Sequence, residues 1–195
     1  MSFLRNLRWI LRHPDAHLEL GMVLAELGEA VPDLGVSDLK SAGDGSAITV
    51  GANTSLGKVF AALADASNLP ECTLHRTQTL PEAILVVNDP EAPRVVVRTD
   101  VMQQLVHAEV GFLFAYALEL AQPGNRMIAS LPQTMRDYLL PALWHVVGFT
   151  DKLSPAAAAL AGQVNEASNE TQREGWALTL EPLRNHDPAE LGQRY

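Results

Sequence analysis

The spacing of apolar residues predicts that most of this chain is helical. Residues 16–30 carry apolar side chains at helical intervals and follow a Pro-Asp pair that favours a helix start. Similar patterns predict further helices at 1–13, 55–67, 100–106, 132–148 (interrupted by Pro141), 154–167, 170–180 and 188–194. The segment 109–121 is almost wholly apolar and stops at a Pro-Gly pair. This composition predicts a central helix that is buried on most sides, with Leu113 and Leu118 in the core.

Two short segments have the composition of β-strands. Residues 83–89 and 93–99 are rich in β-branched side chains and are separated by a turn-forming Asn-Asp-Pro sequence, which predicts a hairpin or two adjacent strands. The Gly/Ser-rich stretch 40–57 surrounds a short strand-like segment and predicts an irregular region or a boundary between two parts of the fold. The predicted class is therefore α+β and predominantly helical, with N-terminal helices in 1–39 and a second domain in 40–195.

Composition and charge narrow the functional classes. The chain contains 14 Lys and Arg residues and 23 Asp and Glu residues, which gives a net charge of −9. An acidic surface repels phosphate backbones, so nucleic-acid binding is disfavoured. No apolar run reaches the roughly 20 residues that a membrane-spanning helix needs. Cys72 is the sole cysteine, so no internal disulfide can form. These features predict a cytoplasmic protein, although the basic, amphipathic segment 1–13 leaves contact with a membrane surface open.

Sequence motifs for catalysis or cofactor binding are all incomplete. The segment GANTSLGKV (51–59) resembles a P-loop but has five residues, not four, between Gly and Gly-Lys, and lacks the Ser or Thr after the lysine. His107 and Glu109 match half of a zinc deaminase motif whose cysteine half is missing. His13 and His17 have no obvious third ligand. We therefore expect no cofactor and no metal.

The helix predicted at 16–30 resembles one helix of a tetratricopeptide repeat. The resemblance rests on Leu20-Gly21, Leu24 and Gly28, and in that family the small residue allows a neighbouring helix to approach closely. No second copy of the repeat is present, and such units bury their faces only when several are stacked. The pattern favours a role in protein interaction.

A longer resemblance covers about residues 56–180. Three segments occur in family order: PRVVVRTDVMQQL, which begins at Pro93, EVGFLFAYALELAQPG (109–124) and NETQREGWALTL (169–180). They resemble a strand-turn-helix segment, the active-site helix and the downstream ligand motif of HtpX-like gluzincin metallopeptidases. The resemblance is closer to the degenerate relatives found in large bacterial tetratricopeptide-repeat proteins.

In this alignment every catalytic position has changed. The positions of the two zinc-binding histidines hold Tyr116 and Leu120, the position of the general base holds Ala117, and Ser168 stands at the third ligand. Zinc needs imidazole or carboxylate ligands, and its bound water needs a base. The resemblance therefore implies a non-catalytic pseudo-peptidase without zinc, acting by protein–protein interaction or as a scaffold, with a protein partner and possible homo-oligomers.

Two alternatives remain open at this point. One is an enzyme with an unrecognised site, for which His107, Glu109, Tyr116 and Glu119 are the candidate polar residues along one helix. The other is a module that binds a small molecule or lipid in an apolar helical cavity. A sizeable apolar pocket would favour the second alternative.

Overall fold

The computed structural model describes residues 17–31, 34, 47–80, 83–89, 92–131 and 133–192 of the chain. The predicted first helix at 1–13, with His13, lies outside the described residues, as does much of the Gly/Ser-rich stretch. Within the described ranges, no helix has the length and apolar character needed to cross a membrane.

The described elements are mostly helical, which confirms the predicted α+β class. The helices are α2 (Leu18–Ala30), α3 (Ser55–Ala66), α4 (Thr99–Gln104), α5 (His107–Leu120), α6 (Pro123–Ser130), α7 (Gln133–Val146), α8 (Pro155–Ala167), α9 (Glu170–Leu180), the 3-10 turn η2 (Glu181–Leu183) and α10 (Pro188–Gly192). The strands are β1 (Ile48–Thr49), β2 (Thr73–Thr77), β3 (Ile84–Val87) and β4 (Arg94–Arg98).

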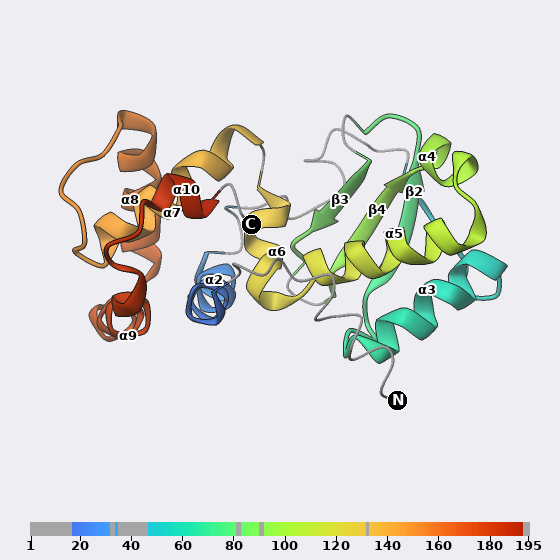
Figure 1. Ribbon diagram of the computed structural model, residues 1–195, viewed down its shortest axis with the longest axis horizontal. Helices are drawn as coiled ribbons and strands as arrows, with labels where there is room; N and C mark the ends of the chain where they lie inside the picture. The colour runs from blue at the N-terminus through green and yellow to red at the C-terminus, as the bar shows by residue number, and fades with distance from the viewer. Residues whose placement is uncertain are drawn as a thin grey trace.

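The four strands form one mixed sheet in the order β1-β2-β4-β3. The predicted adjacent strands are β3 and β4, which pair antiparallel, whereas β2 and β4 pair in parallel with Thr77 opposite Arg98. Helices α3 and α5 lie along one face of this sheet (Figure 1). Strand β2 was missing from the sequence prediction, because TLHRT contains too few apolar residues to stand out.

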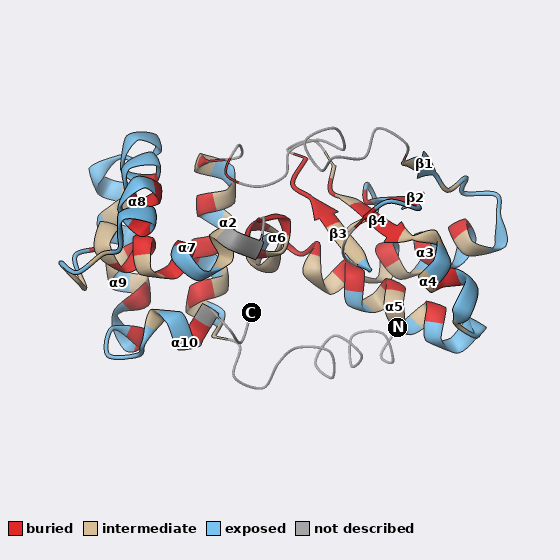
Figure 2. Cartoon of the chain, turned by 90° about the horizontal axis from the view of Figure 1, so that it is seen from above, coloured by how far each residue is buried: buried red, intermediate tan, exposed pale blue. Residues whose placement is uncertain are grey.

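The molecule has two large hydrophobic cores, one in each half of Figure 1. The first lies between the sheet and helices α3 and α5, and the second joins α2 to α6 through α10. Buried positions line the inward sides of the elements in both halves (Figure 2). The described contacts thus place α2 in a common core with the C-terminal helices, while the boundary between 1–39 and 40–195 stays a prediction.

Helix α2 packs most closely against α6, a helix about 100 residues further along the chain. A Cβ atom placed on Gly124 would lie 2.9 Å from the carbonyl oxygen of Gly21 and 3.2 Å from its Cα atom. The close approach expected at Gly21 therefore occurs. Its partner, however, is α6 and not the next helix of a repeat.

Two proline residues act differently from the sequence prediction. Helix α7 runs through Pro141 without interruption. The residues around Pro141 bury large side chains in the helical core, and this burial offsets the lost backbone hydrogen bond. Pro123 marks the end of the predicted central helix but also starts a new helix, α6, where its fixed φ and missing N–H suit the first position.

Candidate functional site

Helix α5 is buried on one side only, so the prediction that it is buried on most sides is wrong. Val110, Phe114 and Leu118 pack on the core beneath the sheet, as predicted for Leu118. On the opposite side, however, 58% of Phe112 and 43% of Tyr116 remain exposed. A sheet can cover only one side of a helix, and no described element covers the other.

The exposed side of α5 continues onto α4 as an apolar surface. A hollow of about 510 Å³ lies between the two helices and is lined by Val101, Leu105, Ala108, Glu109, Phe112 and Leu113. Val106, in the link between the helices, is 64% exposed. We call the apolar residues of this surface the α4–α5 patch: Val101, Leu105, Val106, Ala108, Phe112, Leu113 and Tyr116. Leu113 thus lines a surface hollow and is only partly buried, contrary to the sequence prediction.

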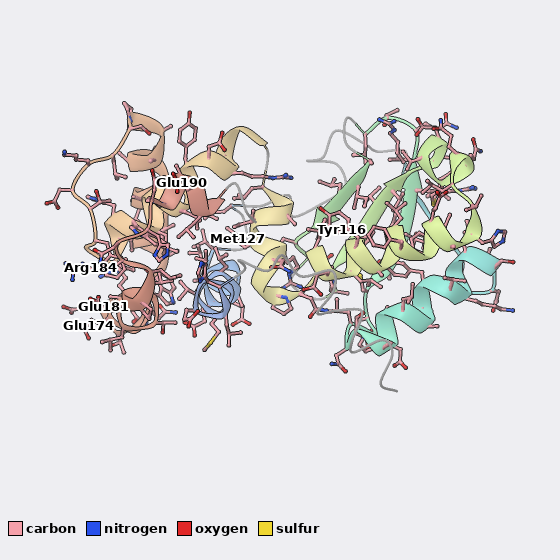
Figure 3. The ribbon with its side chains drawn as sticks, viewed as in Figure 1. Tyr116, Met127, Glu174, Glu181, Arg184 and Glu190 are labelled. Atoms are coloured by element: carbon pink, nitrogen blue, oxygen red, sulfur yellow. The ribbon has the colours of Figure 1, made fainter. Side chains whose placement is uncertain are left out.

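The four positions aligned with peptidase ligands and base have different surroundings. Tyr116 projects from the exposed side of α5 (Figure 3), whereas Ala117 is fully buried against the sheet and Leu120 packs partly against the same core. Ser168 follows the last residue of α8, and α8 and α9 lie in the half of the molecule that does not contain the sheet and α5 (Figure 1). These four side chains therefore do not surround a common point.

Ser168 has a structural role in the helical half. Its hydroxyl donates a hydrogen bond to the carbonyl oxygen of Val164 at 2.7 Å, and the Arg173 guanidinium donates to the Ser168 carbonyl oxygen at 2.5 Å. The Val164 oxygen also accepts a hydrogen bond from the Ser168 N–H at 3.0 Å, so the bond from Arg173 is the one that satisfies a backbone oxygen beyond the last turn of α8. Arg173 of α9 thus closes the α8–α9 turn.

The polar candidates for an unrecognised enzyme also do not converge. The Glu109 carboxylate accepts a hydrogen bond from the Val106 N–H at 2.9 Å and so caps the start of α5. Asn125 donates to the backbone and side-chain oxygens of Glu119, which joins α5 to α6. His107 and Glu119 stand about 18 Å apart along the helix axis, a distance that follows from about 1.5 Å per residue.

The segment that resembles a P-loop forms a capped helix start. The Thr54 hydroxyl donates to the Gly51 carbonyl oxygen at 2.8 Å and accepts from the Gly57 N–H at 3.0 Å, which fixes the first turn of α3. A Cβ atom on Gly57 would lie 2.2 Å from the Gly51 oxygen. Gly57 therefore allows a close approach of the backbone at Gly51, and the Lys58 side chain is exposed.

Cys72 is not poised for nucleophilic chemistry. The side chain is buried beneath the sheet, and burial raises the pKa of the thiol to about 12, against a weaker lowering by Arg126. The thiolate is the reactive form, so at neutral pH Cys72 is an inert thiol. Across the residues that the structure describes, no three His, Cys, Asp or Glu side chains gather as a metal-binding group.

His75 is one of the buried polar residues that the sequence did not single out. It points to the sheet face opposite α3 and α5, since its neighbour Leu74 packs towards those helices. Its Nδ1 lies 3.3 Å from the Thr49 hydroxyl and its Nε2 lies 3.1 Å from the Thr73 hydroxyl. Hydroxyls both donate and accept, so they satisfy the neutral ring. Burial, and then the charge of Arg94, lower the pKa of His75.

The lowered pKa of His75 predicts a loss of stability in mild acid. As the pH falls below about 6.5, the unfolded chain binds a proton at His75 more readily than the folded protein does, so the free energy of unfolding decreases. Urea unfolding at pH 7.5 and 5.5 measures this decrease. We expect it to be smaller in His75→Gln and unchanged in the control His107→Gln, whose side chain is exposed. Equal decreases in the three proteins would contradict the assignment.

Comparison with known proteins adds no relative: no family model matches the chain, and neither the curated proteins nor the solved structures contain a significant match.

Proposed function

We propose that this protein is a non-catalytic binding module that docks a partner protein on the α4–α5 patch. The observation that supports the proposal is the exposure of Phe112, Tyr116 and Val106 around one apolar hollow. Contiguous apolar surface on a soluble domain marks an interaction site more often than an incidental feature. The resemblance to degenerate gluzincins supports a non-catalytic role and would make Tyr116, at a former ligand position, part of the docking surface.

The chemistry of the patch favours an amphipathic helix as the partner segment. Two adjacent helices with a hollow between them suit a third helix that inserts apolar side chains at spacings of three and four residues. Among the described residues that line the hollow, Glu109 alone is charged, and the whole chain carries a net charge of −9. Basic residues beside the apolar stripe of the partner would therefore be attracted to the rim.

The test is a selection of helical peptides from a displayed library, followed by measurement of Kd by fluorescence anisotropy. We expect the selected peptides to combine an apolar stripe with Lys or Arg. Phe112→Ser and Tyr116→Ser should each weaken binding by about tenfold or more, because buried aromatic side chains dominate such interfaces. Leu178→Ser is the matched control, since Leu178 is 79% exposed on α9, away from the patch.

The outcomes separate this proposal from its alternatives. Peptide binding that Leu178→Ser weakens as much as Phe112→Ser would contradict the assignment to the patch. A lipid-binding module is the second candidate, and the apolar lining of the 510 Å³ hollow is the observation that favours it. Saturable binding of a fatty acid that Phe112→Ser abolishes, with no selected peptide, would replace the protein-binding proposal by that candidate.

A further inference from the structure

A second hollow, separate from the α4–α5 patch, lies where the parallel strands β2 and β4 end. Its volume is about 460 Å³, within the range of pockets that hold small molecules. Thr77 ends β2, and Thr99 begins α4 directly after β4, so both residues stand at the carboxyl edge of the parallel pair. Ligands of open α/β sheets bind preferentially outside this edge.

The lining of this hollow is mixed, and six of its seven residues have side chains that can donate a hydrogen bond. It includes one guanidinium, three hydroxyl groups and two amides, which belong to Arg76, Thr77, Gln78, Thr79, Thr99 and Gln103. Ile48 of β1 supplies the remaining, apolar wall. No carboxylate is among the described residues that line the hollow, although acidic residues outnumber basic ones in the chain.

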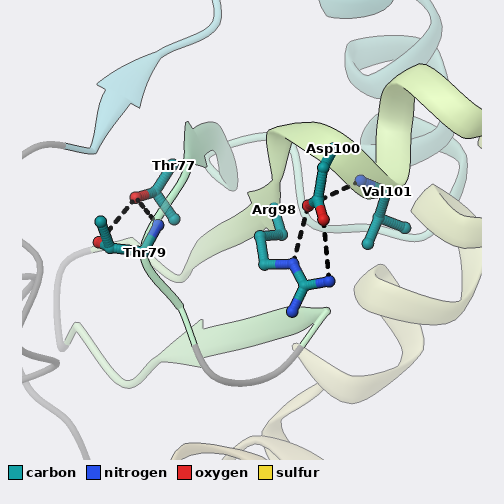
Figure 4. A network of polar contacts seen from close by, with 5 residues as sticks. All are labelled: Thr77, Thr79, Arg98, Asp100 and Val101. Carbon is teal, nitrogen blue, oxygen red and sulfur yellow. Dashed lines mark hydrogen bonds and ion pairs between the residues drawn. The ribbon is translucent and has the colours of Figure 1, made fainter.

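Arg76 supplies a positive charge that no carboxylate of the described residues neutralises. The Arg76 side chain is exposed and has no ion-pair partner within the described ranges. The nearby carboxylate of Asp100 is already engaged: Arg98 donates to its two oxygens at 2.8 and 3.0 Å, and the Val101 N–H donates to one of them at 2.9 Å (Figure 4). This pairing lowers the pKa of Asp100, first through the hydrogen bond from Arg98.

The hydroxyl groups on the β2 side are held close together. Thr77 is 3% exposed, and its Oγ1 accepts from the Thr79 N–H at 3.3 Å and lies 3.4 Å from the Thr79 Oγ1 (Figure 4). These contacts are long for hydrogen bonds between such groups, so they can give way to a stronger acceptor. The Thr79 side chain is exposed and its hydroxyl can turn towards a ligand.

We propose that this hollow, at the carboxyl edge of β2 and β4, binds the phosphate group of a small phosphate monoester. Arg76 neutralises the phosphate, and the hydroxyls of Thr79 and Thr99 donate to its oxygens from a second side, while the buried Thr77 holds Thr79 in place. A phosphate presents three acceptor oxygens in a tetrahedral array, which suits donors from the end of β2 and from α4 better than a planar carboxylate does. Gln103 and Ile48 then face the rest of the ligand.

The test is a titration of the full chain with glycerol 3-phosphate, followed by backbone amide NMR at low ionic strength. We expect saturable shifts at Thr77, Gln78, Thr79 and Thr99, and no shifts with uncharged glycerol. Arg76→Gln should weaken binding by about tenfold or more, since a hydrogen bond to a charged group is lost. Thr79→Val, which preserves shape at an exposed position, should weaken it severalfold.

Lys58→Gln is the matched control for charge, because it removes one exposed cation from the same half of the molecule without touching the hollow. It should leave the Kd for glycerol 3-phosphate unchanged. Equal weakening by Lys58→Gln and Arg76→Gln would show attraction by general charge and overturn the site. Absence of saturable shifts, or equally strong binding of acetate, would overturn the assignment to a phosphate. None of these results depends on peptide binding at the α4–α5 patch.

Discussion

Leu118→Asp is expected to unfold the sheet-containing half of the protein. Leu118 is fully buried on α5 and packs in the core between α5, α3 and the sheet. An aspartate there would be a charged group without a partner in an apolar interior, at a cost on the order of 4 kcal/mol or more. Whole-domain stabilities are about 5–15 kcal/mol, so a large share of the stability would be lost. Circular dichroism during urea unfolding measures the change.

Phe112→Asp is the matched control for this experiment. It introduces the same charge on the same helix, but Phe112 is 58% exposed, so the free energy of unfolding should change by no more than about 1 kcal/mol. Leu113→Asp should fall between the two, because Leu113 is partly buried. If Phe112→Asp destabilises as much as Leu118→Asp, the exposed side of α5 is assigned wrongly and the α4–α5 patch with it.

Gly57→Ala is expected to destabilise the protein by about 1–3 kcal/mol, the usual range for overpacking. The new Cβ atom would lie 2.2 Å from the Gly51 carbonyl oxygen and 3.0 Å from the Ala52 Cα atom. Both are backbone atoms, so relief requires movement of the turn itself. That movement would disturb the Thr54 hydrogen bonds that cap α3. Thermal unfolding followed by circular dichroism measures the loss.

Gly111→Ala, at a second helical glycine, is expected to raise the stability of the protein. Nothing lies within 4 Å of a Cβ atom placed on Gly111, in the interior of α5. Alanine is favoured over glycine inside a helix, so this variant should gain up to about 1 kcal/mol. A loss of stability in Gly111→Ala, or a gain in Gly57→Ala, would contradict the backbone geometry described for these helices.

Local pattern was sufficient to predict several elements of the fold. The helix at 55–67 appears as α3, and the segments 154–167 and 170–180 appear as α8 and α9. Each has a capping side chain at its start, such as Ser154 before α8 and Asn169 before α9. These signals act within a few residues of the chain, so a single sequence contains them.

The candidate sites depended on contacts between distant residues. Thr77 and Thr99 flank the same hollow because β2 and β4 pair in parallel, and β2 has no clear apolar pattern of its own. The hydrogen-bonding contact between His75 and Thr49 exists only because β1 pairs with β2, and this pairing joins distant parts of the sequence. The α4–α5 patch was hidden for a different reason: an almost wholly apolar helix does not indicate which side the sheet will cover.

The sequence by itself determined the class of the protein and the starts of several helices. Those features follow from residue identity and from interactions over three or four residues. The tertiary structure decided which side of α5 is exposed, which helix meets Gly21, and that Tyr116 and Ser168 belong to helices of two different cores. The physical reason is that burial and close approach depend on how remote segments pack, and many packings share one local pattern.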